Sequence, residues 1–138
     1  MNEGHYAVVV GINQYAGFTA LQRAVRDAVE VGKWLAGDGG VPHIHRVIQD
    51  AADPRRPIMQ EVFGAVLEWR MHVNAQIDAG KLRWTDTRLY VYVSGHGYAA
   101  NGSDAALFTA DASQHALYGV SLAKLRDFLE ESQEFREI

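Results

Sequence analysis

The residue best suited to chemistry is a histidine that comes directly after an apolar run. His96 stands between Gly95 and Gly97, just past the run Leu89–Val93. Flanking glycines let the backbone turn sharply and leave the imidazole accessible, and an imidazole exchanges protons near neutral pH. His96 is therefore a candidate general acid–base, although the same pattern also fits a loop histidine that hydrogen-bonds its own turn.

Other residues with chemical potential lie in less specific patterns. His43 and His45 fall on the same side of a predicted strand and could chelate a metal, but no carboxylate or third histidine is obviously placed with them, which favours surface residues. Asp27, early in a predicted helix, fits a solvated carboxylate. Ser94 lacks the G-x-S-x-G frame of a nucleophile elbow. The loop at 11–17, GINQYAG, lacks the lysine and Ser/Thr of a phosphate-binding loop.

The elements that must position these residues alternate between strand and helix. Apolar runs at 6–10 and 89–93, and a weaker alternation over His43–Gln49, predict buried strands. Helical spacing follows each of them, and the second helix is predicted to begin near Asp53. The last helix, capped by Ser121, is expected to turn four apolar residues inward: Leu122, Leu125, Phe128 and Leu129. This order predicts a mostly parallel sheet with helices on both faces, with His96 beyond the carboxyl end of a strand, where functional groups collect.

Composition narrows the class of protein. The 138 residues fit one domain, and 48% hydrophobic against 22% charged residues is a globular balance. A net charge of −4 with no basic stripe argues against nucleic-acid binding. No apolar run approaches the ~20 residues of a membrane-spanning helix, and the N-terminus has no signal-peptide pattern. The chain has no cysteine, so a cytoplasmic protein without membrane partners is expected.

Five segments of the sequence, in order, resemble consecutive landmarks of the caspase-like cysteine peptidases, and bacterial and metacaspase-type members are the most similar. The strand ending in SGHG is the most specific landmark. The segments are YAVVVGINQY, LQRAVRDA, RLYVYVSGHG, ALFTADAS and SLAKLRDFLEE. The resemblance implies an α/β fold of the caspase/hemoglobinase type, a three-layer sandwich with a mostly parallel central sheet.

The resemblance also implies roles for individual residues. His96 would assist a cysteine nucleophile held on the next strand, and the backbone N–H of Gly97 would stabilise the oxyanion. Asp27 and Ser94 would line a pocket for an Arg or Lys side chain of a protein or peptide substrate. Some family members need calcium; Asp104 and Asp111 leave a calcium site open without supporting it. No other cofactor and no metal site are expected.

The chain departs from the family at its nucleophile. Caspase-type histidines precede their cysteine by about 50 residues, which puts the cysteine near position ~146. We therefore expect residues 1–138 to form a single caspase-like domain without its cysteine-bearing strand, inactive alone. The missing strand would follow in a longer chain or come from a second chain. The alternative is a non-catalytic caspase-like interaction or scaffold module.

Overall fold

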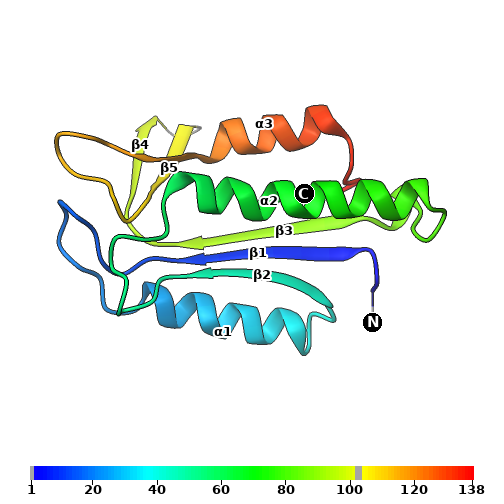
Figure 1. The fold of residues 1–138 in the computed structure, drawn as a ribbon, viewed down its shortest axis with the longest axis horizontal. Coiled ribbons are helices and arrows are strands. Elements are labelled where there is room, and N and C mark those ends of the chain that lie inside the picture. Colours follow the sequence, from blue (N-terminus) through cyan, green and yellow to red (C-terminus); the bar gives the residue numbers. More distant parts are fainter. Residues whose placement is uncertain (1, 102–103) are drawn as a thin grey trace.

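The computed structural model describes residues 2–101 and 104–138 (Figure 1). The strands and helices, in chain order, are β1 (His5–Gly11), α1 (Ala24–Ala36), β2 (His43–Ile48), α2 (Met59–Asp78), the 3-10 turn Trp84–Asp86, β3 (Arg88–Ser94), β4 (Gly97–Asn101), β5 (Asp104–Phe108), β6 (Gly119–Ser121) and α3 (Leu122–Ser132). None of the described helices has the length and apolarity to cross a membrane.

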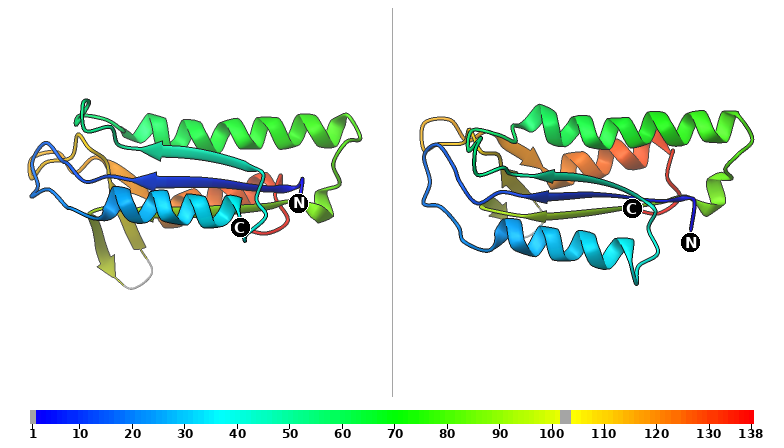
Figure 2. Two further views of the ribbon diagram at one scale, coloured as in Figure 1. Left: turned by 90° about the horizontal axis from the view of Figure 1, so that it is seen from below. Right: turned by 60° about the horizontal axis from the view of Figure 1, so that its bottom comes forward.

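The main sheet is parallel and lies between layers of helices. Its strand order is β2-β1-β3, and both neighbours run parallel to β1. Helix α1 covers one face, whereas α2 and α3 cover the other (Figures 1 and 2). The predicted α/β class, with a parallel sheet between helices, is thus confirmed.

The composition of β1 explains its place at the centre of the sheet. Every residue of 6–11 is buried, as expected for an apolar strand covered on both faces. Val8 and Val10 pack into the core that includes Val66 of α2 and Leu129 of α3. Because side chains alternate along a strand, Ala7 and Val9 face the opposite core, with Ala28 and Leu35 of α1. A single strand therefore joins the two hydrophobic cores.

A second sheet, which the sequence did not predict, follows His96. Strands β4, β5 and β6 form it in that order, and both pairings are antiparallel. All of β4 thus comes from the glycine-containing segment directly after His96, and residues 102 and 103 lie outside the described part of the chain. His96 therefore sits at the junction of the parallel and the antiparallel sheet.

Two helical predictions need correction. Helix α2 begins at Met59 and not near Asp53, because the carboxylate of Glu61 accepts a hydrogen bond from the Ile58 N–H at 2.8 Å and so caps the helix there. Phe128 was expected to face inward, yet its side chain is exposed. The Arg70 guanidinium lies 4.3 Å from the Phe128 ring centre, and this cation–π contact covers part of the ring from outside the core.

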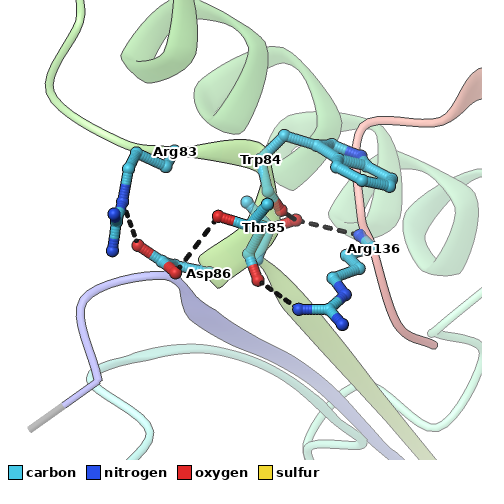
Figure 3. Close-up of polar contacts among 6 residues, drawn as sticks. Arg83, Trp84, Thr85, Asp86 and Arg136 are labelled. Carbon is cyan, nitrogen blue, oxygen red and sulfur yellow. Dashed lines mark hydrogen bonds and ion pairs between the residues drawn. The ribbon is translucent and has the colours of Figure 1, made fainter.

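The segment after α3 is anchored at the start of β3. The Arg136 N–H donates to the Thr87 hydroxyl at 2.9 Å, and its guanidinium donates to the Thr85 carbonyl at 3.2 Å (Figure 3). The Leu89 N–H then donates to the Glu137 carbonyl at 2.9 Å, and Glu137 forms a parallel bridge with Arg88. Among the described residues, this bridge is the only pairing on the outer edge of β3. The segment thus pairs with β3 in the parallel direction at one position.

An ion pair connects this segment to α2 and gives a pH-dependent prediction. Two nitrogens of Arg70 bind the Glu134 carboxylate at 3.0 and 3.2 Å, and both side chains are less than one-fifth exposed. Burial alone would raise the pKa of Glu134, but the hydrogen bonds from Arg70 and Ser132 and its own backbone outweigh it and lower the pKa below the ordinary value of 4.5. The contribution to stability is therefore fully present above pH 4.5 and is lost as pH falls through the lowered pKa.

We expect Glu134→Gln to lower the free energy of unfolding by about 1.5–3 kcal/mol at pH 7, because a hydrogen-bonded charge is removed. The difference from the wild type should shrink as pH falls below 4.5, in urea unfolding measured at pH 7 and pH 3. The control is Glu130→Gln, which breaks the exposed pair with Arg126 and should cost less than about 1 kcal/mol. An equal loss in both variants, or a Glu134→Gln loss that is the same at both pH values, would contradict this prediction.

Candidate active site

His96 is held by two contacts from the loop between β1 and α1. Its backbone N–H donates to the Tyr15 hydroxyl at 2.7 Å, and its ring nitrogen Nε2 lies 2.7 Å from the Thr19 carbonyl oxygen. The Tyr15 ring meets the imidazole edge-on, with ring centres 5.0 Å apart. The Phe18 ring lies 6.2 Å from the imidazole and stacks on Phe108 at 5.1 Å. The backbone and the ring of His96 are therefore both fixed.

The contact with Thr19 determines which ring nitrogen is available for chemistry. A carbonyl oxygen can only accept a hydrogen bond, so Nε2 must carry the proton. In the neutral imidazole, Nδ1 then holds a free lone pair and can take a proton from a neighbouring acid. A base whose second nitrogen is held by a hydrogen bond is the arrangement that activates a thiol or hydroxyl nucleophile.

The N–H of Gly97 points away from the neighbouring strand. The Phe108 N–H donates to the His96 carbonyl at 2.9 Å, so His96 and Phe108 occupy the position of a hydrogen-bonded pair, with one of its two bonds formed. Such pairs alternate with non-bonded pairs along an antiparallel ladder, and Gly97–Leu107 is the next pair. The Gly97 N–H is thus directed to the outer edge of β4, where it can donate to a ligand. A Cβ at Gly97 would lie 2.8 Å from the Ala106 carbonyl oxygen, which favours glycine there.

A groove leads from His96 along the outer edge of β3. The cavity beside His96 has a volume of about 290 Å³ and is lined mostly by apolar residues, among them Val93, Leu107 and Leu122. A second cavity of about 170 Å³ shares Val93 and Leu122 and continues toward Ile138. Both cavities lie beside the strand edge that the segment ending at Ile138 begins to pair.

Ser94 and Asp27 are the other predicted residues of the site. Ser94 ends β3, half-buried, and pairs with Gly11. Asp27 lies in the first turn of α1 and is exposed. Neither is among the described residues that line the cavity beside His96. They are linked indirectly, because α1 packs on Gly11: a Cβ there would lie 2.7 Å from the Ala28 side chain.

His43 and His45 do lie on one side of β2, as predicted. Each imidazole has a glutamate near it, which the sequence did not reveal. Nε2 of His43 lies 3.8 Å from the Glu3 carboxylate, and Nε2 of His45 lies 2.8 Å from that of Glu68. Both rings also pack on aromatic side chains, His43 on Tyr6 at 4.5 Å between ring centres. These histidines thus help to seat α2 on the edge of the sheet.

Gln49 supports the loop beside His96, and nothing in the sequence pattern had indicated this. Only 7% of its surface is exposed, and it makes four hydrogen bonds. Its carbonyl oxygen accepts from the N–H groups of Asn13 and Gln14, while its amide donates to the carbonyls of Gln14 and Pro54. Gln49 therefore fixes the start of the loop that carries Tyr15 and Thr19.

Another cavity lies at the opposite end of the sheet. It has a volume of about 540 Å³ and lies beside the amino ends of β1 and β3. Four of its charged side chains form two pairs: Arg83 donates to the Asp86 carboxylate at 2.8 Å (Figure 3), and Arg88 pairs with Glu137. Arg136 and Glu137 of the anchored segment line this cavity, so the ion pair between Arg88 and Glu137 helps to hold that segment at the start of β3.

Within the described residues, no group of three or more His, Cys, Asp or Glu side chains is placed to hold a metal ion. Asp104 begins β5 and is exposed, and the Asp111 carboxylate accepts a hydrogen bond from the Thr109 hydroxyl at 2.6 Å. Neither aspartate belongs to such a group among the described residues.

Comparison with known proteins leaves the family open. The sequence matches no protein-family model and no curated protein.

Proposed function

We propose that this chain is the histidine-bearing part of a caspase-like cysteine endopeptidase that cleaves after Arg or Lys. The cysteine would come from a segment outside these 138 residues. One observation carries the proposal: His96 is held through Nε2, beside the Gly97 N–H, at the end of a strand whose outer edge is paired only at its start among the described residues. A base and an oxyanion donor thus lie together beside an edge that can take another strand.

The register of β3 supports a nucleophile on a strand next to β3, opposite His96. Glu137 lies opposite Arg88, so the eighth residue after Glu137 would lie opposite His96 if the strand continued in register. The family spacing of about 50 residues between histidine and cysteine leads to nearly the same place, near ~146. The apolar groove beside β3 would receive the inward side chains of such a strand.

In the proposed reaction, Nδ1 of His96 takes the proton of the cysteine thiol, and the thiolate attacks the peptide carbonyl carbon. The Gly97 N–H stabilises the negative charge on the carbonyl oxygen. The imidazolium then gives its proton to the leaving amine, and water hydrolyses the thioester. Asp27, whose carboxylate is exposed at the start of α1, would pair with the basic side chain of the substrate, and Ser94 would shape the same pocket.

The first experiment is intact mass spectrometry, under denaturing conditions, of the protein purified from its native cells with an N-terminal tag. We expect a cysteine-bearing segment, either within a longer chain or as a second polypeptide. That material should hydrolyse peptides ending in Arg or Lys much faster than matched peptides ending in Asp or Ala.

The opposite result would be the 15.3 kDa chain alone, without hydrolysis. It would overturn the peptidase proposal and support the alternative of a non-catalytic interaction module. The absence of cysteine from these 138 residues is the observation that favours this alternative.

A further inference from the structure

We propose that Tyr15 is a positioning residue, which orients the imidazole of His96 by binding the backbone N–H of the same residue. The inference rests on the proposed role of His96 as the base. The Tyr15 hydroxyl accepts the His96 N–H at 2.7 Å and lies 3.3 Å from the Ile12 carbonyl, to which it donates. One hydroxyl thus links the end of β1 to the turn that carries the imidazole.

The turn is shaped around this hydroxyl. A Cβ at Gly95 would lie 2.5 Å from the Tyr15 hydroxyl oxygen, so the missing side chain of Gly95 leaves the space that the hydroxyl occupies. The Phe108 N–H donates to the His96 carbonyl. In a regular antiparallel ladder, the His96 N–H would donate to the Phe108 carbonyl in return. The N–H binds Tyr15 instead, and this sets the peptide plane before His96.

The loop that carries Tyr15 is rigid enough to position another group. Gln49 holds its start through the N–H groups of Asn13 and Gln14. The N–H groups of Ala16 and Gly17 donate to the carbonyls of Ala110 and Ala112 at 2.8 and 3.1 Å. Burial raises the pKa of the Tyr15 hydroxyl above its ordinary value of 10, although the hydrogen bond from His96 opposes this. At neutral pH the hydroxyl keeps its proton and can both donate and accept.

Tyr15 and Thr19 therefore hold His96 at two points, the backbone and Nε2. Without the Tyr15 hydroxyl, the His96 N–H loses its acceptor and the backbone can rotate. The Thr19 carbonyl favours the tautomer with the proton on Nε2. The ring would then move away from its position next to this carbonyl. A fixed tautomer would become a mixture, and fewer molecules would present a free Nδ1.

The test is Tyr15→Phe, with Tyr98→Phe as the matched control because Tyr98 is an exposed tyrosine, 55% accessible, on the neighbouring strand β4. Long-range proton–nitrogen NMR spectra of the imidazoles report the His96 tautomer, and hydrogen exchange reports its backbone N–H. We expect Tyr15→Phe to speed exchange of the His96 N–H by about tenfold or more and to give a mixture of tautomers. Tyr98→Phe should change neither. A folded Tyr15→Phe variant with both signals unchanged would overturn the proposal.

Two further measurements decide the matter if Tyr15→Phe does not fold. In the wild type, the His96 N–H must exchange slowly; fast exchange would overturn the proposal. Gly95→Ala should disturb the same two signals, since its Cβ takes the place of the hydroxyl. None of these measurements uses peptide hydrolysis, so they stand or fall separately from the peptidase proposal. In an active enzyme, Tyr15→Phe should lower kcat and leave KM nearly unchanged.

Discussion

His96→Ala should reduce kcat/KM for Arg- and Lys-ending peptides by about 10²–10⁴-fold in the cysteine-bearing enzyme that we propose. The reason is geometric: the His96 ring is held through Nε2 beside the Gly97 N–H, and no described residue hydrogen-bonds Nδ1. Alanine removes both the base that activates the thiol and the acid that protonates the leaving amine. The measurement is steady-state hydrolysis of a fluorogenic peptide.

The matched control is His115→Ala, because His115 is an exposed histidine outside the groove. It should retain nearly full activity. If His96→Ala is folded and keeps more than half of the wild-type activity, His96 is not the catalytic base and the proposed mechanism is wrong.

Gln49→Leu should lower the free energy of unfolding by about 3–5 kcal/mol. The substitution nearly keeps the volume, but it removes all four side-chain hydrogen bonds of a 93%-buried residue and leaves backbone groups of Asn13, Gln14 and Pro54 without their partner. A buried polar group left unpaired costs about 1–3 kcal/mol. Urea unfolding followed by tryptophan fluorescence measures the loss, since the chain has three tryptophans.

The control is Gln60→Leu, the same change at an exposed glutamine in the first turn of α2. It should stay within about 0.5 kcal/mol of the wild type. A Gln49→Leu loss below 1 kcal/mol would show that the loop does not depend on Gln49. Because that loop carries Tyr15 and Thr19, a folded Gln49→Leu variant should also show a mixture of His96 tautomers.

The parallel sheet could be predicted from the sequence because its signal is local. The runs at 6–10 and 89–93 are apolar without interruption, which predicts strands buried on both faces. The prediction is confirmed for β1, whereas β3 is mostly half-buried, since Leu89 is its one buried residue. Strands β4 and β5 could not be predicted, since small residues and glycine dominate them and resemble a loop. The start of α2 was placed too early because Asp53 before Pro54 is a good helix-start pattern, whereas the structure uses Glu61 and Ile58.

His96 could be singled out from the sequence as a candidate because two glycines flank a histidine directly after an apolar strand. Gly97 was added by the family resemblance, and the roles of both residues stay predictions. The Thr19 carbonyl could not be predicted, since every residue has a carbonyl and its position depends on a loop 77 residues away in sequence. Gln49 was missed for a similar reason: it contacts residues 35 and 36 positions away, and a buried glutamine has no periodic pattern.

The anchored segment after α3 has a consequence for assembly. Because the bridge between Arg88 and Glu137 already sets the register, a strand continuing from Ile138 would meet the edge of β3 as an intramolecular partner, at a high effective concentration. A separate chain would instead lose translational and rotational freedom on docking. Cleavage after the strand had paired would leave the hydrogen bonds in place, and two polypeptides would remain together. If the strand were instead cleaved from the chain before it paired with β3, its binding to β3 would depend on the concentrations of both polypeptides.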